Sequence, residues 1–290
     1  PSLSSAAIAP NSGVTTSTVL NCSGQSTDND GEAVTTTYTW TNQTQATSLG
    51  NSATLVLTPS TVAPADVVLC TVTATDPHGD SDSVDVSVDV ENTDPTIQSI
   101  GISPDSGVTT TSTVSCQVSA SDVDGGSPAI SYEWTVSGNV VGSAMQLDLT
   151  PSMVSPSDTV TCTATATDSS GGTASDSTGV TVENTDPVFT ADASITPDTG
   201  VITGTVLNCA AVATDIDDGS ATLNYVWLNG TNVIGSGQTA TVSASNSDVG
   251  DSLTCEVTAT DSDGGTTVST AAVSVENTAP SLSSAVSYTH

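Results

Sequence analysis

One phrase of sequence occurs three times in this chain at almost equal spacing. It reads VSVDVENTDP at 86–95, GVTVENTDP at 179–187 and AVSVENTAP at 272–280. The closing prolines and the opening Pro1 are separated by steps of 94, 92 and 93 residues. A constant period of this length indicates tandem copies of one folding unit, which restricts the chain to repeat architectures.

The period predicts three domains, at residues 1–94, 95–186 and 187–279, called the first, second and third repeats below. Residues 280–290 are expected to begin a further repeat or to act as a docking tail, because PSLSSA occurs at 1–6 and again at 280–285. About 93 residues is near the size at which a two-sheet sandwich buries one core.

The local patterns are those of β-strands. Val84, Val86 and Val88 alternate with polar residues, which is typical of a half-buried strand, and no stretch shows helical periodicity. The P-[DN]-[ST]-G stretches at 10–13, 104–107 and 197–200 provide the fixed and positive backbone angles of tight turns. The predicted fold class is therefore all-β, with three tandem sandwiches in an elongated array.

The charge balance excludes several partners. The chain has 32 acidic residues, no lysine, no arginine and two histidines, giving a formal net charge of −32. Such a chain repels nucleic acid phosphates and anionic membrane surfaces. No apolar run approaches the roughly 20 residues of a membrane span. We therefore expect no nucleic acid partner and no membrane insertion of this segment.

Each repeat contains a cysteine, a Y-x-W motif and a second cysteine, and in this it resembles an immunoglobulin-type sandwich. In that fold the two cysteines lie on strands B and F, and the tryptophan of strand C packs on their disulfide. The resemblance implies three disulfides, each within its own repeat: Cys22 with Cys70, Cys116 with Cys162, and Cys209 with Cys255. Disulfides imply an oxidising, extracytoplasmic compartment.

The linker phrase V-x-V-E-N-T-D-P is similar instead to the junctions of cadherin repeats, where acidic and asparagine side chains bind calcium. As a whole the chain resembles bacterial surface proteins built from Ig-like, cadherin-like or PKD-like arrays. It departs from cadherins in having cysteine pairs and in lacking arginine, and the third linker has Ala279 in place of the aspartate.

Aspartates recur at one offset from every cysteine. One lies six residues after each first cysteine and another six residues after each second cysteine. In an Ig-type sandwich these equal offsets bring both carboxylates to one end of the domain, where the preceding linker arrives. Asp66 and Asp158, before the second cysteines, could approach a junction from its other side. The predicted metal ligands are Glu91, Asn92, Asp94, Asp122, Asp124 and Asp168 at the first linker, and Glu183, Asn184, Asp186, Asp215, Asp217 and Asp261 at the second.

Calcium suits such a site, because it takes six to eight oxygen ligands from carboxylates, amides, carbonyls and water. The alternative is ordinary turn chemistry, in which T-D-x-D-G forms Asx turns and binds nothing. A transition-metal site is disfavoured, since His78 and His290 are single, unrepeated and expected to be solvated.

The sequence favours a structural role. No repeat places a histidine beside its serines and threonines, lysine is absent and all cysteines are assigned to pairs, so we expect no enzyme. The interpretation is an extracellular or cell-surface spacer or filament component that joins further repeats or copies head to tail. An adhesin-type module for an unknown surface ligand is the alternative, although the chain has only eight aromatic residues with which to bind sugars.

Overall fold

The computed structural model describes residues 1–280 of the chain. These residues form twenty-one β-strands, and no helix in them is long and apolar enough to cross a membrane. The strands belong to six sheets, three with three strands and three with four. The protein is therefore an all-β array of Ig-like sandwiches, with the strands that the alternating pattern predicted and the fold that the resemblance implied.

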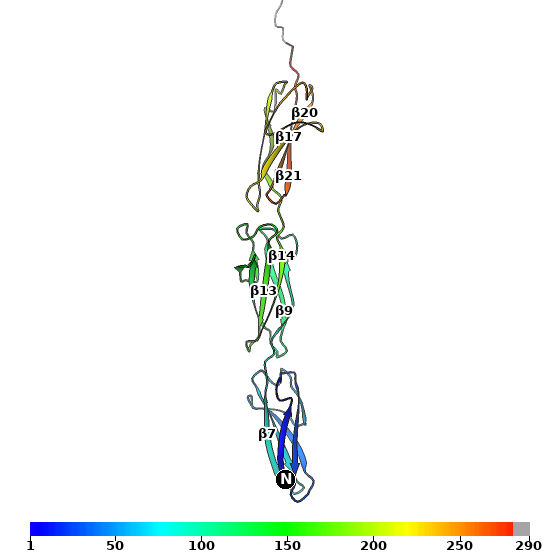
Figure 1. Cartoon of the computed structure of the whole chain (residues 1–290), viewed down its shortest axis with the longest axis vertical. Helices are drawn as coiled ribbons and strands as arrows, with labels where there is room; N and C mark the ends of the chain where they lie inside the picture. Colours follow the sequence, from blue (N-terminus) through cyan, green and yellow to red (C-terminus); the bar gives the residue numbers. More distant parts are fainter. Residues whose placement is uncertain (281–290) are drawn as a thin grey trace, which may run out of the picture. The chain divides into compact units, whose positions relative to one another are not determined.

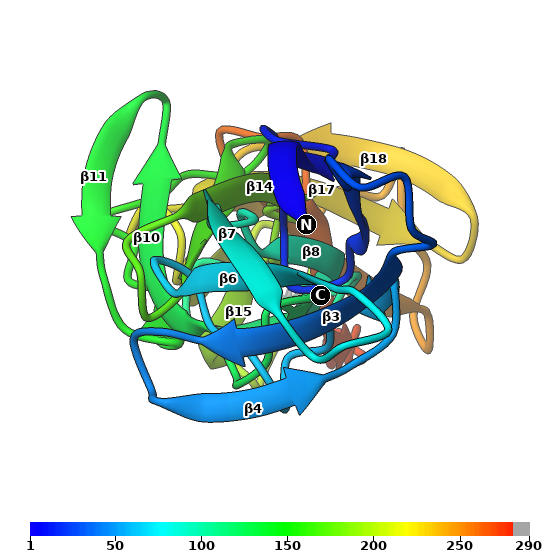
Figure 2. The same cartoon turned by 90° about the horizontal axis from the view of Figure 1, so that it is seen from below.

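The first repeat contains one sheet of each size. Its three-stranded sheet has the order β1-β2-β5, and its four-stranded sheet has the order β4-β3-β6-β7, which Figure 2 shows. This is the arrangement of strands A, B and E facing C′, C, F and G in an immunoglobulin domain. The strands are β1 (Ser2–Ala9), β2 (Val19–Thr27), β3 (Thr35–Asn42), β4 (Thr47–Gly50), β5 (Thr54–Val56), β6 (Val67–Thr75) and β7 (Ser81–Asp89).

The second repeat has the same strand order. Its sheets are β12-β9-β8 and β11-β10-β13-β14. The strands are β8 (Thr96–Ser103), β9 (Thr113–Ser121), β10 (Ala129–Val136), β11 (Asn139–Gly142), β12 (Gln146–Asp148), β13 (Thr159–Thr167) and β14 (Thr173–Thr181).

The third repeat keeps this order again, with sheets β15-β16-β19 and β18-β17-β20-β21; Figure 1 labels β17, β20 and β21. The strands are β15 (Val188–Thr196), β16 (Val206–Thr214), β17 (Thr222–Asn229), β18 (Asn232–Ser236), β19 (Thr239–Thr241), β20 (Ser252–Thr260) and β21 (Thr266–Ser274).

The chain divides into two compact units. The first contains Pro1–Asp105, Ser115–Leu147 and Thr161–Gly179, and the second contains Ser106–Val114, Asp148–Val160 and the chain from Val180 onward. The division falls within the second repeat, so the domain boundaries at 94/95 and 186/187 remain a proposal. The linker at 91–95 and the loops that follow it lie in the first unit, and the linker at 183–187 with its loops lies in the second.

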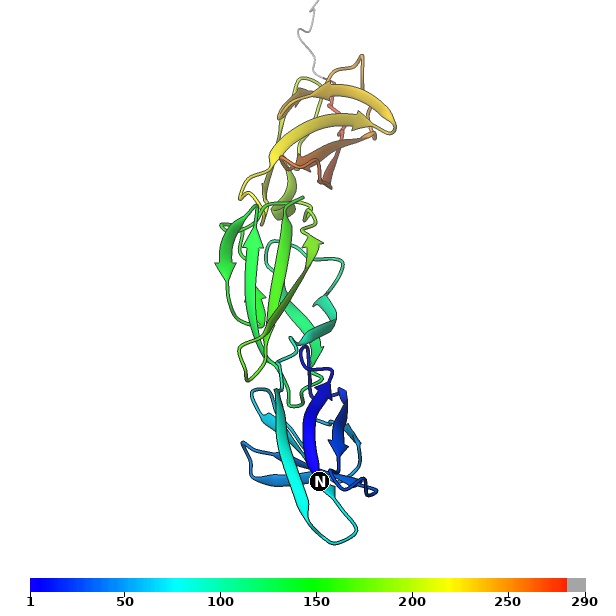
Figure 3. The same ribbon diagram turned by 60° about the horizontal axis from the view of Figure 1, so that its bottom comes forward.

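Alternating burial builds each core. In β6, Val68, Cys70, Val72 and Ala74 are fully buried and the residues between them are half-buried. The tryptophans of the Y-x-W motifs are fully buried, and each indole N–H donates to a main-chain oxygen, that of Ser52, Ala144 or Gly237. At the edges, β1 lies beside β7 (Figure 3), where the Leu3 N–H donates to Asp82 Oδ2 at 2.8 Å.

The turns and cross-links follow the sequence patterns. Gly13, Gly107 and Gly200, which end the P-[DN]-[ST]-G turns, have φ between 65° and 67°. Three disulfides join the cysteines in the pairs that the resemblance implied, at sequence separations of 48, 46 and 46: Cys22 with Cys70, Cys116 with Cys162, and Cys209 with Cys255.

Reduction of these disulfides should destabilise the protein. Closing loops of nearly 50 residues restricts the unfolded chain, and native bridges typically contribute roughly 2–5 kcal/mol each. We expect the urea midpoint to fall markedly in reductant, and the double variant Cys22→Ala/Cys70→Ala to reproduce part of this loss. Equal midpoints with and without reductant would mean that the cores suffice alone.

Candidate cation site at the repeat junctions

The linker glutamates bind the turns of their own repeats. The Glu91 N–H donates to Val14 O at 2.6 Å, and Glu91 Oε1 accepts from the Gly13 N–H at 2.8 Å. The same two contacts join Glu183 to Val108 and Gly107, and Glu276 to Val201 and Gly200. One oxygen of each glutamate predicted as a metal ligand, Glu91 and Glu183, is thus committed to fixing the start of its linker.

The next linker residues meet the loop between β13 and β14. Asn92 Nδ2 donates to Asp168 Oδ2 at 2.9 Å. A Cβ atom added to Gly172 would lie 2.5 Å from Asp94 Oδ1 and 2.6 Å from Asn92 Nδ2, and closer still to Asp168 Oδ2. The Asp94 and Asp168 oxygens therefore lie within about 5 Å of each other around a position that only glycine fits.

The second junction repeats this arrangement. Asn184 Nδ2 donates to Asp261 Oδ2 at 2.9 Å. A Cβ atom added to Gly265 would lie 2.6 Å from both Asn184 Nδ2 and Asp186 Oδ1, and closer to Asp261 Oδ2. Six residues predicted as ligands are thus brought together in two sets of three: Asn92, Asp94 and Asp168, and Asn184, Asp186 and Asp261.

A second acidic loop approaches each linker from the turn after β9 or β16. The Asp124 N–H donates to Asp122 Oδ1 at 2.6 Å, which forms an Asx turn. Asp124 Oδ2 then accepts from the Thr93 N–H at 2.6 Å, and Asp124 Oδ1 accepts from Thr16 Oγ1 at 2.7 Å. Both oxygens of Asp124 are therefore held by the preceding repeat and its linker.

The corresponding loop of the second junction is more deeply buried. Asp217 accepts from the Thr185 N–H at 2.7 Å and from Thr110 Oγ1 at 2.5 Å. Asp215 and Asp217 are 5% and 8% exposed, whereas Asp122 and Asp124 are only half-buried. Any ion at the second junction would therefore be better shielded from water.

Buried oxygens without partners are concentrated at these junctions. In residues 1–280, five buried side-chain oxygens or nitrogens lack a hydrogen-bond partner, and all five are oxygens of linker residues or of the loop after β9 or β16. They are Thr93 Oγ1 and Asp122 Oδ2 at the first junction, and Asn184 Oδ1, Thr185 Oγ1 and Asp215 Oδ2 at the second. Such atoms are rare in native structures, and an ordered water or an ion is a partner that would satisfy them.

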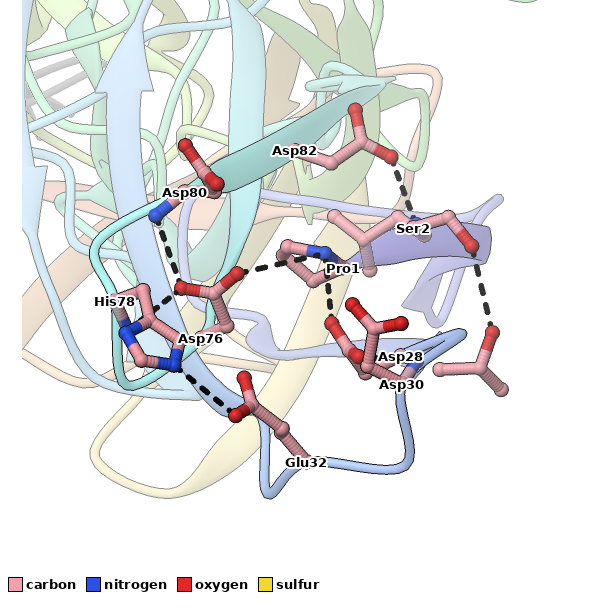
Figure 4. A network of polar contacts seen from close by, with 11 residues as sticks. Pro1, Ser2, Asp28, Asp30, Glu32, Asp76, His78, Asp80 and Asp82 are labelled. Carbon is pink, nitrogen blue, oxygen red and sulfur yellow. Dashed lines mark hydrogen bonds and ion pairs between the residues drawn. The ribbon is translucent and has the colours of Figure 1, made fainter.

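The matching loop of the first repeat holds a positive charge. The Pro1 ammonium lies 3.0 Å from Asp28 Oδ2 and 4.0 Å from Asp76 Oδ2, in a cavity of about 230 Å³ (Figure 4). A hydrogen bond to Asp28 raises the pKa of this amine, and the same bond lowers the pKa of Asp28. The equivalents of Asp28 Oδ2 are the unpartnered oxygens of Asp122 and Asp215.

The remaining acidic side chains satisfy their own loops. No group of three or more histidine, cysteine or acidic side chains in the described part of the chain is arranged to hold a metal by itself. Asp66 Oδ2 accepts from Asn42, Gln45 and the Ala63 N–H, so it stabilises its own loop. His78 is an exposed loop residue whose Nε2 lies 3.1 Å from Glu32; His290 lies outside the described residues.

Sequence reasoning missed Thr16 and Thr110, which reach carboxylates 108 and 107 residues away. Their G-V-T-T context matches ordinary turn chemistry. It also missed Gly172 and Gly265. Only glycine fits at these two positions, because side chains of the preceding linker lie where a Cβ atom would be. The only signal available was recurrence: the threonine occurs in all three repeats, whereas the glycine occurs in two, because the first repeat has Asp80 at that position.

The pKa values of Asp168 and Asp261 are lowered in the folded state. For Asp168 the main cause is the hydrogen bond from Asn92, helped by the N–H groups of the loop. For Asp261 burial opposes ionisation most strongly, but the bond from Asn184 and the loop N–H groups outweigh it. Both carboxylates are thus ionised at neutral pH, next to another aspartate.

Acid should loosen the linker contacts. Because the folded pKa values are depressed, their stabilising contribution is fully present above the ordinary carboxyl pKa near 4 and is lost as pH falls through the folded values. The urea midpoint should therefore decline below about pH 4. Asn92→Leu should lower the urea midpoint at pH 7 more than at pH 2. The control Asn139→Leu, at an exposed position on β11, should change the midpoint equally at both pH values. A midpoint constant from pH 5 to pH 2 would contradict this assignment.

Comparison with solved structures finds matches that cover most of this chain at low sequence identity. No family model and no curated protein sequence matches the chain. The five-domain Sidekick-1 immunoglobulin structure is 15% identical, covers 96% of this chain and has a TM-score of 0.33; the chain spans 60% of that structure.

Two further structures are of other kinds. The structure described as a Ca²⁺-stabilised adhesin that helps an Antarctic bacterium bind ice is 16% identical, with 94% of this chain and 73% of that chain covered and a TM-score of 0.35. Cadherin domains 3–6 of protocadherin gamma B2 are 15% identical, with 94% and 78% covered and a TM-score of 0.32. The solved structures that match this chain therefore include tandem Ig-like domains, cadherin domains and a bacterial adhesin.

Proposed function

We propose that this protein is a non-enzymatic, extracellular spacer or filament component whose repeat junctions are stiffened by calcium. The three disulfides support an oxidising compartment. The same linker contacts recur at both junctions, which supports a role that every repeat performs rather than chemistry at one site. The domains are residues 1–94, 95–186 and 187–279.

The observation that carries the calcium proposal is the set of five unpartnered buried oxygens at the junctions. They comprise carboxylate, amide and hydroxyl oxygens with no nitrogen or sulfur, the ligand chemistry of a hard cation. Flexible calcium coordination also admits main-chain carbonyls and several waters, so three carboxylates per junction suffice. At the first junction Asp94, Asp122 and Asp168 supply the charge, and at the second Asp186, Asp215 and Asp261.

The three linkers should differ in affinity. The second junction has three unpartnered oxygens and the first has two. Asp215 is also better buried than Asp122, and burial strengthens the attraction between an ion and a carboxylate. The third linker has Ala279 in place of the aspartate. We therefore rank the junctions second, first and third.

The described surface of the protein favours a spacer function over a sugar-binding adhesin function. All three tryptophans are fully buried in the cores, so none provides an exposed stacking platform. A groove of the third repeat, about 570 Å³, is lined mainly by polar residues from Asn229 to Asp251. We therefore place the adhesin-type function second.

Calcium binding should be measurable and should stiffen the chain. Titration calorimetry at about 0.15 M salt is expected to show two sites with Kd values in the 0.1–1 mM range of extracellular modules, the second junction being tighter. Small-angle scattering should show a larger maximum dimension and less flexibility in calcium than in chelator. Identical scattering curves in calcium and in chelator would mean that the junction aspartates only stabilise their turns.

Single substitutions should assign the two sites. Asp215→Asn should remove the tighter site and Asp122→Asn the weaker one, because each removes the charge of an unpartnered oxygen. The matched control is Asp89→Asn, at an exposed position on β7. If Asp89→Asn reduces binding as much as the other two, calcium is only screening the general negative charge.

The glycines at the linker contacts provide a test from the backbone side. Gly172→Ala should disrupt the contact of Asp94, Asn92 and Asp168, because its Cβ would overlap all three. We expect at least tenfold weaker calcium binding at the first junction. Gly101→Ala, whose Cβ would meet nothing within 4 Å, should have no effect. Unchanged affinity in Gly172→Ala would exclude this contact from the site.

A further inference from the structure

A threonine hydroxyl and a linker N–H hold one aspartate at both junctions. Asp124 accepts from Thr16 Oγ1 and the Thr93 N–H, and Asp217 accepts from Thr110 Oγ1 and the Thr185 N–H. We call this contact the junction latch. Its donor half belongs to the preceding repeat and its linker, and its acceptor half is the aspartate of the following loop.

Burial indicates that the latch is a specific contact. Thr16 and Thr110 are both 0% exposed, although each lies in a surface turn of its own repeat. Their hydroxyls donate to carboxylate oxygens, and hydrogen bonds to a charged group are about twice as strong as neutral ones. The same donors and acceptors form this contact at both junctions, so a chance contact explains it poorly.

The third repeat presents a donor half that meets no acceptor among residues 1–280. Thr203 occupies the position of Thr16 and Thr110, two residues after the valine of the G-V turn, and it is exposed. The Glu276 N–H donates to Val201 O at 2.6 Å, as the other linker glutamates do in their repeats. The linker therefore starts in the same way, and the Thr278 N–H follows it as Thr93 and Thr185 do.

The first repeat presents an acceptor half that receives no latch donor from the described residues. The Asp30 N–H donates to Asp28 Oδ1 at 2.8 Å, the same Asx turn that precedes Asp124 and Asp217 in their loops. Asp30 is exposed, and none of the described hydrogen bonds ends on its carboxylate. Figure 4 shows it beside Asp28 at the end of the repeat.

We propose that the donor half at Thr203 and Thr278 binds the acceptor half at Asp28–Asp30 of a second copy of this chain. The proposal deepens the spacer function, on which it rests, by naming the partner and its contact. Such a contact uses a different surface on each copy, so it can join more than two copies in series.

Two features oppose this association and shape its test. Each copy carries a net charge of −32, so the experiment uses about 0.15 M salt, which screens charges beyond roughly 8 Å. Pro95 and Pro187 directly follow their linkers, so Pro280 of one copy and Pro1 of the next compete for one place. The full chain is therefore compared with a chain ending at Ala279.

Sedimentation equilibrium of complementary variants provides the test. Asp30→Asn keeps the donor half and weakens the acceptor half, whereas Thr203→Val keeps only the acceptor half. In the background ending at Ala279, the unsubstituted chain should form a ladder of oligomers. Each variant alone should associate at least about tenfold more weakly, because a bond to a charged group is lost. An equimolar mixture of the two should form dimers and little else.

Matched controls separate the latch from general surface effects. Thr270→Val and Asp89→Asn change an exposed threonine on β21 and an exposed aspartate on β7, and both should still form the ladder. A ladder that persists equally in Thr203→Val and Asp30→Asn, or no association of either chain length at millimolar concentration, overturns the proposal.

A thiol cross-link gives a second readout if association is weak. Chains carrying Thr203→Cys and Asp30→Cys should form a mixed disulfide dimer faster than Thr203→Cys with Asp89→Cys. All measurements are made with calcium and with chelator. Association in chelator that calcium does not change would support the junction latch and reject the calcium site. Calcium binding without association would support the calcium site and reject the junction latch between copies.

Discussion

The absence of lysine and arginine is the constraint on which the rest of this structure depends. Thirty-two acidic side chains must be stabilised without lysine or arginine partners. The fold meets this requirement with N–H and amide donors: Asp168 accepts from the N–H groups of Ser170 and Gly172, and Asp66 from two side-chain amides. Where such donors run out, buried carboxylate oxygens remain unpartnered, and this happens only at the junctions among the described residues.

Among the described residues, the buried side-chain oxygens without a hydrogen-bond partner therefore lie at the junctions. Each linker begins with a glutamate that binds its own repeat and continues with an asparagine and an aspartate that meet the next loop. The glutamate fixes where the linker starts, and the latch fixes where the next loop lies. A cation that neutralises the remaining oxygens would act on contacts that already exist, so it would stiffen the junction without being needed to fold the sandwiches.

The sequence predicted much of the fold because its signals are local and repeated. The alternation of Val84, Val86 and Val88 specifies a strand, and the glycines of the P-[DN]-[ST]-G turns adopt the positive φ that those turns need. The shared offset from the cysteines also placed Asp168 correctly against Asn92. These inferences needed only strand geometry and the period of the repeat.

The rest depended on contacts that no local pattern reveals. Glu91 was expected at the cation site, yet one of its oxygens binds Gly13, because the turn supplies an N–H before the next loop is reached. Thr16 resembles any turn threonine until Asp124 is brought to it from more than one hundred residues away. The repeat period predicts that such positions recur, but it does not predict which residues they contact.

The central claim is that the unpartnered junction oxygens hold a hard cation. Anomalous diffraction from crystals grown in calcium tests it most directly, because it identifies the element and its position together. The account predicts a calcium peak about 2.3–2.6 Å from Asp215 Oδ2, and a weaker one at Asp122 Oδ2. Ordered water at both oxygens in calcium-saturated crystals would contradict it.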